Sequence, residues 1–553
     1  MTLQMATRTG TWKSRSQGYS AISSSFMGCS FLKLEPHNSF SLAVVYATHG
    51  TPNPLGLAGH YSVLPWGISA VMKRARLWLD QCLKEHTACS SEAESELPTR
   101  VLDLDTGNPD SVRLRETQGE RARYMCLSYC WGRSKFLRTV KGNLERHKQG
   151  ISLAEMPLTF RHVIQITRKF GVRYLWIDSL CIIQDDDADW RREAARMADI
   201  FRNSYLTVAP TWAESANDGC FPPPDRRGTV QIGQFSVDLV PHFWIDWELD
   251  SKRRADFPML TRGWVYQERM LSPRILHFGR QEMLWECREH RTCECGRMRF
   301  LVYETSIGGF RKMMSQPESG DHDDLQNLWR KMVVEYTALE LTVRTDRLPA
   351  LAGLATAVRR RRRQEYLAGL WRDTLAPDMC WFLRDPSLRP PEPGAVRRKP
   401  TWSWASVDGP VDYPYMLNHN GAVRDVYVDV LEAKCASPTS PTPQQDEQFV
   451  ELRCVLIPAR VKGIKLVMEA LGKSYKYYPD WESETEEQDC YVIPLLRLRW
   501  GWSVPMLIVR PTAQGSQEMF RMGFAEIGDD SEDLCDMITE QTERGMLKRV
   551  KIV

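Results

Sequence analysis

Two short, continuously apolar runs flank one helical pattern, and this arrangement constrains the fold more than any other feature of the chain. The first run, Tyr124–Tyr129, stops just before Gly132, where glycine permits a backbone turn that a side chain would hinder. A helical pattern covers 157–171, and the second run is Tyr174–Ile177. Strand, helix and strand at this spacing predict a βαβ unit, so we expect an α/β fold with a parallel sheet.

Several side chains follow these two strands at the point where each strand ends. Ser128, Tyr129 and Trp131 come after the first strand, and Asp178 comes after the second. Ligands of parallel sheets gather at the carboxyl ends of the strands, so we predict that these four residues line a binding site. For Asp178 a second interpretation stays open with equal weight, because an aspartate here also caps backbone N–H groups of a turn.

The next helix is predicted to begin at the acidic run 185–187, because carboxylates favour the positive end of a helix dipole. An apolar stripe then recurs at helical spacing, at Trp190, Ala194, Met197 and Phe201. Glu193 lies only about 60° from this stripe, at the margin of the buried face. Its carboxylate is either held by an ion pair, with Arg196 as the adjacent candidate, or acts on a ligand; spacing alone favours the ion pair.

Shorter elements are predicted around this unit. A helix covers 71–86, and strands cover 100–104 and 205–209. Another helix covers 261–271, and a glycine turn between two apolar runs predicts a β-hairpin over 274–287. The C-terminal third contains strand-like runs, and the segment 437–447 is predicted to be a flexible loop.

Composition excludes several classes of protein. The 553 residues carry 73 Lys or Arg and 70 Asp or Glu, a net charge of +3, which argues against nucleic acid as a partner held mainly by charge. A hydrophobic content of 42% excludes disorder throughout. The 15 scattered cysteines favour a reducing compartment, and no apolar run approaches the roughly 18 residues of a spanning helix. We therefore predict a cytoplasmic protein without a membrane span.

Two groups of residues have the composition of metal ligands. The first is Cys82, His86 and Cys89, which share one face if the helix continues that far. The second is Cys287, Cys293 and Cys295 near His290. The first group offers three lone ligands without a matching second cluster, so a buried cysteine and a helix-terminal histidine explain it as well. The spacing of the second group matches no common structural zinc site, so we favour reduced cysteines and predict no metal and no bound cofactor.

Basic residues at two places suggest targeting. Five consecutive arginines, 359–363, resemble a nuclear-import patch, although cations are also favourable at the end of a helix. The first fifty residues are rich in Ser and Thr and loosely imitate a transit peptide, but a disordered extension explains them better. A nuclear location therefore stays open beside the cytoplasmic one.

Four sequence blocks, in order, resemble the fungal heterokaryon incompatibility (HET) domain. They are YMCLSYCWG at 124–132, the block 157–184 ending in RYLWIDSLCIIQ, DWRREAARMADIFRNSYLTVA at 189–209, and TRGWVYQERMLSP at 261–273. The predicted organisation is a disordered extension over 1–60, a lead-in over 61–123 and the HET domain over 124–269. A hairpin and helical connector over 270–400 and a β-rich (α+β) accessory region over 401–553 follow.

The resemblance implies a role in fungal non-self recognition, in which fusion of genetically unlike cells triggers growth arrest or cell death. It also implies a distant relation to TIR domains and their flavodoxin-like parallel sheet. Some TIR domains cleave NAD⁺ with a helical glutamate three residues after a tryptophan, and the matching pair here is Trp190 and Glu193. The resemblance thus implies Glu193 as the catalytic residue, Trp190 as a substrate-binding residue, and NAD as the substrate.

The alternative is a non-enzymatic signalling or oligomerisation module in the same response, and the sequence leaves open whether the protein is an enzyme. An open cleft facing Glu193 would favour catalysis, whereas burial of Glu193 against an arginine would favour the signalling module. The partners implied are an incompatible allelic or non-allelic protein and further copies of the same chain.

Overall fold

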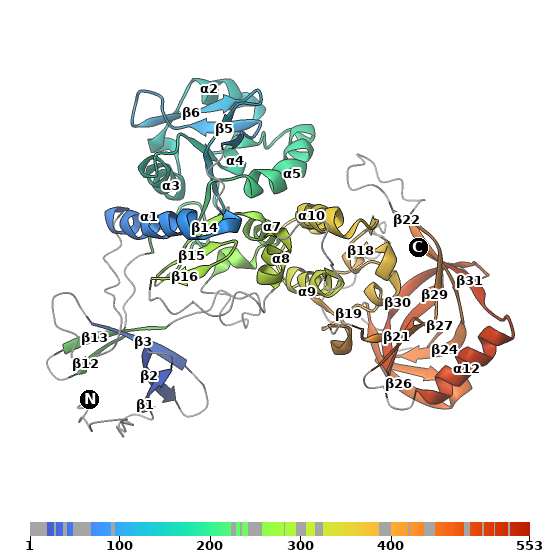
Figure 1. Ribbon diagram of the computed structural model, residues 1–553. Coiled ribbons are helices and arrows are strands. Elements are labelled where there is room, and N and C mark those ends of the chain that lie inside the picture. The colour runs from blue at the N-terminus through green and yellow to red at the C-terminus, as the bar shows by residue number, and fades with distance from the viewer. Residues whose placement is uncertain are drawn as a thin grey trace. The chain divides into compact units, whose positions relative to one another are not determined.

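A computed structural model describes most of the chain (Figure 1). The described residues are 68–89, 94–222, 257–280, 282–294, 306–315, 325–385, 400–418, 421–435, 448–480, 487–499, 503–513, 515–528 and 531–553, with the backbone of five further strands. Unit 1 comprises 1–261 and 268–315, and unit 2 comprises 262–267 and 316–553. No described helix is long and apolar enough to cross a membrane.

The five further strands form a sheet of their own, in the order β1-β2-β3-β13-β12. Their bounds are β1 (Tyr19–Phe26), β2 (Cys29–Pro36), β3 (Ser41–Ala47), β12 (Gly228–Ile232) and β13 (Phe235–Pro241). Three of them lie in the stretch 1–60, for which the sequence predicts a disordered extension. The remainder of that stretch, and the segment 437–447, are outside the described residues.

Unit 1 is built on a nine-stranded mixed sheet in the order β16-β15-β14-β11-β8-β10-β5-β6-β9. The bounds are β5 (Arg100–Asp103), β6 (Ser111–Glu116), β8 (Tyr124–Leu127), β9 (Ile151–Ser152), β10 (Tyr174–Trp176), β11 (Leu206–Ala209), β14 (Arg274–Phe278), β15 (Met283–Cys287) and β16 (Arg291–Cys293). Two short strands, β4 (Ser95–Glu96) and β7 (Arg121–Ala122), pair separately.

Parallel pairing is confined to the centre of this sheet. Strand β8 pairs in parallel with β10 on one side and with β11 on the other, and β11 pairs in parallel with β14. The βαβ prediction is confirmed, and so is the antiparallel hairpin of β14 and β15. Because the chain crosses from β10 past β8 to β11, the carboxyl end of β8 lies at a reversal of strand order, where α/β folds place ligands.

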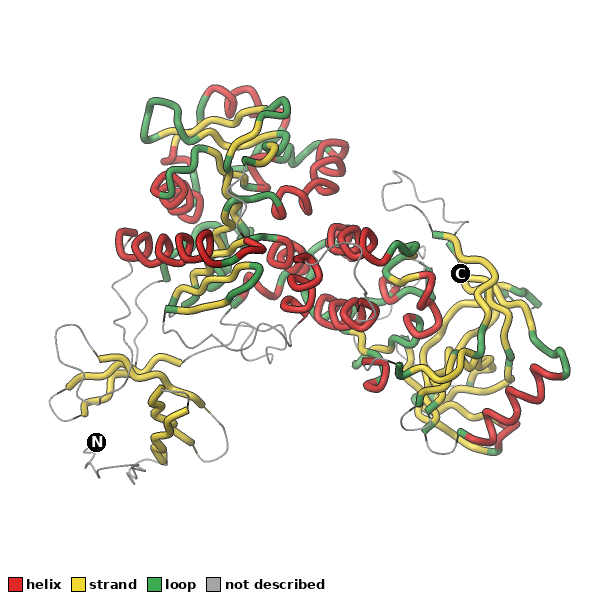
Figure 2. Tube along the Cα trace, in the orientation of Figure 1, coloured by secondary structure: helices red, strands yellow, loops and turns green. Residues whose placement is uncertain are grey.

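Helices connect and cover these strands (Figure 2). They are α1 (Ile68–Glu85), α2 (Leu144–Gln149), α3 (Leu158–Lys169), α4 (Asp178–Cys181), α5 (Asp187–Arg202) and α8 (Ser306–Ser315), while α7 (Gly263–Leu271) passes from unit 2 into unit 1. In α3 the predicted face is buried: Phe160, Val163, Ile164 and Thr167. Gly171 follows α3 with φ +74, as the predicted cap requires.

The buried face of α5 differs from the predicted one. Glu193 is at its centre and is 1% exposed, whereas Trp190 and Ala194 are only half-buried. The helix is rotated because Asp189, one turn before Glu193, is also buried and is paired with Arg100 of β5. An ion pair thus satisfies the polar first turns, and Met197 is the first buried apolar residue of α5.

Unit 2 contains a closed barrel. An extra pairing of β29 with β30 closes a ring in the order β30-β26-β25-β24-β27-β29, and β31, β23 and β22 extend the sheet beyond β30. The bounds are β22 (Asp429–Lys434), β23 (Phe449–Cys454), β24 (Ile457–Lys462), β25 (Lys465–Met468), β26 (Lys473–Pro479), β27 (Gln488–Pro494), β29 (Val504–Pro511), β30 (Glu518–Ile527) and β31 (Lys548–Ile552). The prediction of a β-rich C-terminal region is confirmed.

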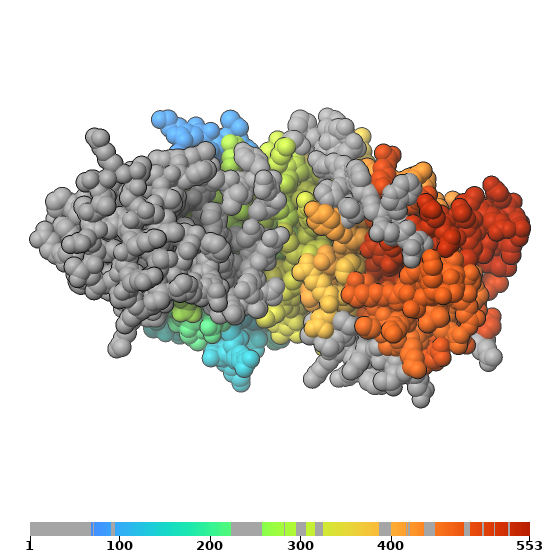
Figure 3. Space-filling view, turned by 90° about the horizontal axis from the view of Figure 1, so that it is seen from below, coloured from blue at the N-terminus to red at the C-terminus, as the bar shows by residue number. Residues whose placement is uncertain are grey.

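Apolar side chains from the barrel strands fill its core, and α12 (Glu532–Glu543) adds Leu534, Cys535 and Ile538 to the same cluster. In the space-filling view the C-terminal residues, orange to red, form one continuous body (Figure 3). The other elements of unit 2 are α9 (Leu325–Thr337), α10 (Ala352–Arg362), α11 (Leu375–Asp378), β17 (Tyr366–Leu367), β18 (Leu370–Trp371), β19 (Phe382–Leu383), β20 (Val411–Asp412), β21 (Val423–Val426) and β28 (Leu496–Leu498).

Candidate functional site

The residues predicted from the two strand ends do lie side by side. The indole N–H of Trp131, after β8, donates a hydrogen bond to Oδ2 of Asp178, at the start of α4, with a distance of 2.8 Å. The Tyr129 hydroxyl is 2.8 Å from the Ser179 hydroxyl. Parallel pairing of β8 with β10 aligns these ends, so the adjacency follows from the sheet itself.

Asp178 also has the capping contact of its alternative interpretation. Its Oδ1 accepts the backbone N–H of Ser179 at 2.6 Å, while Oδ2 accepts the indole of Trp131. Tyr129 and Trp131 both pack edge-on against Phe136, at centroid distances of 6.3 and 5.6 Å. The hydrogen bonds of Tyr129 and Trp131 therefore fasten the loop after β8 to the start of α4.

Ser128 faces a different element. Its hydroxyl donates to the carboxylate of Glu268 in α7, and both residues are buried. The five predicted binding residues thus occur in separate environments: Ser128 lies against Glu268, Tyr129 and Trp131 lie against Asp178 and Ser179 of α4, and Trp190 is on the half-buried flank of α5.

Glu193 is enclosed by the protein. Its carboxylate is 3.6 Å from Nε of Arg192, and its Oε1 has no hydrogen-bond partner although it is buried. The predicted partner, Arg196, instead lies 3.8 Å from Glu96 and donates to the hydroxyl of Thr99. The helical spacing identified the burial of Glu193, but the cation beside it is its own chain neighbour.

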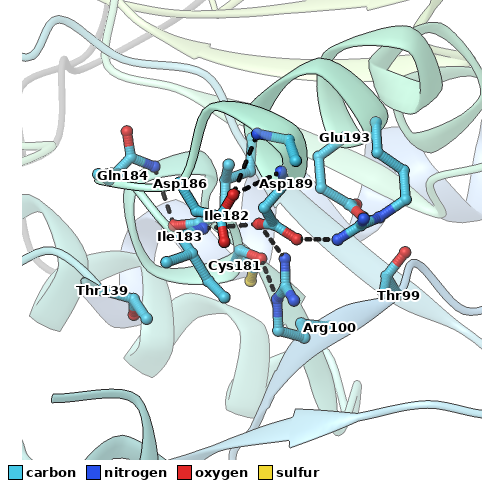
Figure 4. Close-up of polar contacts among 12 residues, drawn as sticks. Thr99, Arg100, Thr139, Cys181, Ile182, Ile183, Gln184, Asp186, Asp189 and Glu193 are labelled. Atoms are coloured by element: carbon cyan, nitrogen blue, oxygen red, sulfur yellow. Dashed lines mark hydrogen bonds and ion pairs between the residues drawn. The ribbon is translucent and has the colours of Figure 1, made fainter. Parts of the chain in front are cut away.

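A buried pair that the sequence analysis missed holds the start of α5 (Figure 4). Arg100 of β5 bonds to Asp189 and donates from Nε to the carbonyl of Cys181 at 2.7 Å. Asp189 also accepts the backbone N–H of Ile183 at 2.9 Å. Burial alone would raise the pKa of Asp189, but Arg100 and this N–H hold it below its usual value. The sequence signal for this pair was Arg100, a charged residue at the start of the run 100–104 that is predicted to be a strand.

These contacts make the carboxyl ends of β8 and β10 a tightly bonded polar network. Asp189 is matched by Arg100 and Arg192, and Asp178 by an indole and a backbone N–H. Such a network fixes α4 and α5 on the sheet. Glu193 Oε1 is the one carboxylate oxygen of the network that is buried without a hydrogen bond.

A cavity of about 260 Å³ lies at the opposite ends of the parallel strands. Residues that immediately precede or begin β8, β11 and β14 line it, and its cations are Arg123, Arg202, Arg274 and Arg288. None of the residues predicted from the strand ends lines this cavity, which is suited by charge to an anion.

The two cysteine groups considered as metal ligands are rearranged by the fold. Cys82, His86 and Cys89 come together with Cys287, the last residue of β15. Cys293, on β16, lies opposite Leu284 of β15, and Cys295 is outside the described residues. One member of the second group therefore completes the first.

The arginine run 359–363 is partly internal. Arg361 is buried, and Arg362 bonds to Asp373 at 2.9 Å and lies 5.3 Å from the ring centre of Trp371. These contacts give two of the five arginines a structural role at the end of α10.

Comparison with known proteins identifies one region. No curated protein and no solved structure matches the chain. The family model described as heterokaryon incompatibility protein (HET) matches residues 124–268. This range begins with β8 and ends in α7, and it contains the parallel strands β8, β10 and β11 together with Asp178, Asp189 and Glu193. Arg100, which pairs with Asp189, lies outside it. Residues 124–268 of this chain are therefore a heterokaryon incompatibility domain.

Proposed function

We propose that this protein is an effector of heterokaryon incompatibility, which arrests growth or kills the cell when genetically unlike fungal cells fuse. The observation that carries this proposal is the HET match over residues 124–268. The domain acts through protein contacts, with an incompatible partner and with further copies of the chain, rather than by catalysis.

The environment of Glu193 supports a non-enzymatic role. A carboxylate that stabilises an oxocarbenium ion must face the substrate. Glu193 is instead 1% exposed, lies beside Arg192 and occupies the centre of the buried face of α5. Its burial beside Arg192 is the arrangement expected of a structural carboxylate.

Cleavage of NAD⁺ is the second candidate, favoured by the unbonded Glu193 Oε1 at a reversal of strand order. In that reaction the bond between ribose and nicotinamide breaks and water adds, giving nicotinamide, ADP-ribose and a proton. Glu193 would stabilise the ribosyl cation, with Ser128, Tyr129, Trp131, Asp178 and Trp190 as the predicted binding residues. This candidate requires α5 to move so that Glu193 becomes accessible.

The experiment is inducible expression in fusing hyphae of like and unlike genotype, with growth and total NAD⁺ followed together. The variants are Glu193→Ala, the conservative Glu193→Gln, and Asp199→Ala as a matched control on the exposed face of α5, where Asp199 pairs with Arg202 at 3.0 Å. Folding is compared by circular dichroism.

Growth arrest with a constant NAD⁺ level supports the signalling proposal. Depletion of NAD⁺ by the intact chain and by Asp199→Ala, but by neither Glu193 variant, would replace it with the enzymatic candidate. Continued growth of unlike fused cells that contain folded protein contradicts the effector role itself.

A further inference from the structure

We propose that Cys82, His86, Cys89 and Cys287 bind one zinc ion in a closed, structural site. One ligand atom from each of the four residues lies within 4.8 Å of all the others. Three sulfurs and one imidazole nitrogen form a common set of structural zinc ligands, and all four residues belong to unit 1. This site is separate from the HET-domain residues discussed above.

The distances suit tetrahedral coordination. Zinc–sulfur bonds of about 2.3 Å and zinc–nitrogen bonds of about 2.0 Å place tetrahedral sulfurs about 3.8 Å apart and sulfur about 3.5 Å from nitrogen. The Sγ of Cys287 is 3.3 Å from Nδ1 of His86. The largest distance between two ligand atoms is up to 4.8 Å, which exceeds the tetrahedral sulfur–sulfur distance by about 1 Å. Rotation of the side chains can close this difference.

Local structure at the end of α1 aims three ligands at one point. Cys82 and His86 are one turn apart, and the N–H of His86 donates to the carbonyl of Cys82 at 3.1 Å. A short 3₁₀ turn, Thr87–Cys89, then brings Cys89 back to the same side, with its N–H 3.1 Å from the carbonyl of His86. The fourth ligand comes from β15, about two hundred positions later in the chain.

Burial indicates a structural site rather than a catalytic one. Cys82, Cys89 and Cys287 are at most 1% exposed, and only His86 reaches the surface in part. With four protein ligands, no coordination position is left for water or substrate. Soft thiolates also select zinc over magnesium or calcium.

Neighbouring groups complement the charge of the occupied site. Three thiolates, a neutral imidazole and Zn²⁺ carry a net charge of −1. Arg274 donates to the carbonyl of Cys89, and Arg288 donates to that of Ala88 at 3.1 Å, so two guanidinium groups adjoin the ligands. The N–H of His290 donates to Cys287 Sγ at 3.2 Å, an outer contact that orients a ligand.

The ion would fasten α1 to the edge of the sheet. Helix α1 lies beside β15 (Figure 1). Trp78 of α1 and Trp285 of β15 lie against each other, with ring centres 6.4 Å apart, and Trp78 precedes Cys82 by one helical turn. Zinc would join the same two elements covalently, through ligands contributed by each.

The test measures the metal content of the intact chain purified with reductant and supplied with zinc. We expect one zinc per chain, and we expect Cys287→Ser to reduce it to background. Cys293→Ser is the matched control, because Cys293 is equally buried on the adjoining strand but outside the cluster. It should keep full zinc content.

Cobalt substitution keeps the test decisive if Cys287→Ser does not fold. The intact chain with Co²⁺ should show the ligand-field and sulfur-to-cobalt bands of a tetrahedral thiolate site, and zinc should displace them. A chain that binds neither metal, keeps zinc after loss of Cys287, or joins two of these cysteines in a disulfide under the same reducing conditions overturns the proposal.

Discussion

Glu286 on β15 is a fully buried carboxylate surrounded by cations. Arg269 forms an ion pair with it, and Arg291 and Arg311 each lie 3.4 Å from its oxygens. Burial alone would raise the pKa of Glu286, but Arg269 and Arg291 hold it well below its usual value. Burial lowers the pKa of the adjacent His277, which keeps that ring neutral. Glu286 is therefore a counter-charge shared by three buried guanidinium groups.

We predict that Glu286→Gln lowers the free energy of opening of β14 and β15 by about 3–5 kcal/mol at pH 7, because it leaves buried guanidinium groups without a counter-charge. The folded pKa lies below the unfolded value, so this stabilisation is present above about pH 4.5 and is lost as the pH falls further. Hydrogen exchange of the β14 and β15 amides at pH 7 and pH 4 measures both effects.

Glu96→Gln is the control, because its side chain is 62% exposed and its ion pair is long, at 3.8 Å. Equal losses at Glu96 and Glu286, or a Glu286→Gln chain that keeps the full acid dependence, would contradict this account.

For single residues, the sequence predicted which side chains are buried better than it predicted which groups those side chains contact. Helical spacing put Glu193 near the buried face of α5, but which cation lies beside it depends on side-chain rotamers. The proposed zinc ligands show the same limit, since three of them follow one another at the end of α1 and Cys287 is brought in only by the tertiary fold. The roles predicted for Ser128, Tyr129, Trp131, Asp178, Trp190 and Glu193 stay predictions.

At the level of elements, the turn after β8 depends on Gly132. Its φ is +73, and a Cβ added there would lie 2.4 Å from Cβ of Ser215. A glycine shortly after an apolar strand predicts a glycine-dependent turn at this position. The identity of the opposing residue, 83 positions later, was not predictable from local sequence.

We predict that Gly132→Ala destabilises unit 1 by about 1–3 kcal/mol more than Gly171→Ala. Both glycines have φ near +74, so both substitutions strain the backbone alike, but nothing lies within 4 Å of a Cβ at Gly171. The difference between the two urea denaturation curves therefore isolates the collision with Ser215. Indistinguishable curves would show that the loop at Ser215 yields freely.

The elements predicted well were those specified by neighbouring residues, such as α3 and the β14–β15 hairpin. The order of strands in the sheet was harder, because β8 pairs with β10 and β11 through contacts between distant segments. A flavodoxin-like or TIR-like identity for this sheet stays a prediction from the HET resemblance.

On the scale of the whole chain, the last strand completes the sheet of unit 2. Strand β31 pairs with β23 over five residues and pairs in parallel with the first two residues of β30. The β-rich character of this region was readable from apolar runs. Closure of the barrel was not, because it depends on β29 pairing with both β27 and β30.

We predict that removing residues 548–553 exposes β22 and β23 while the barrel persists. Strand β23 would lose β31 and keep only β22, whereas β24, β27 and β29 keep all their partners. Hydrogen exchange should accelerate in 449–454 and stay slow in 490–494. The control is Lys548→Ala, an exposed substitution that keeps the backbone of β31. Uniform acceleration through the barrel would show that β31 is required for closure.

The order in which the strands of unit 1 occur along the chain also determines when each strand can find its partner during synthesis. Strand β11 ends at Ala209, but its outer partner β14 begins only at Arg274, 65 residues later. A ribosome adding roughly 5–20 residues per second needs about 3–13 s to supply that partner. Throughout this interval the nascent chain presents an unpaired apolar strand edge, which is the kind of surface that chaperones bind and that aggregates when they do not.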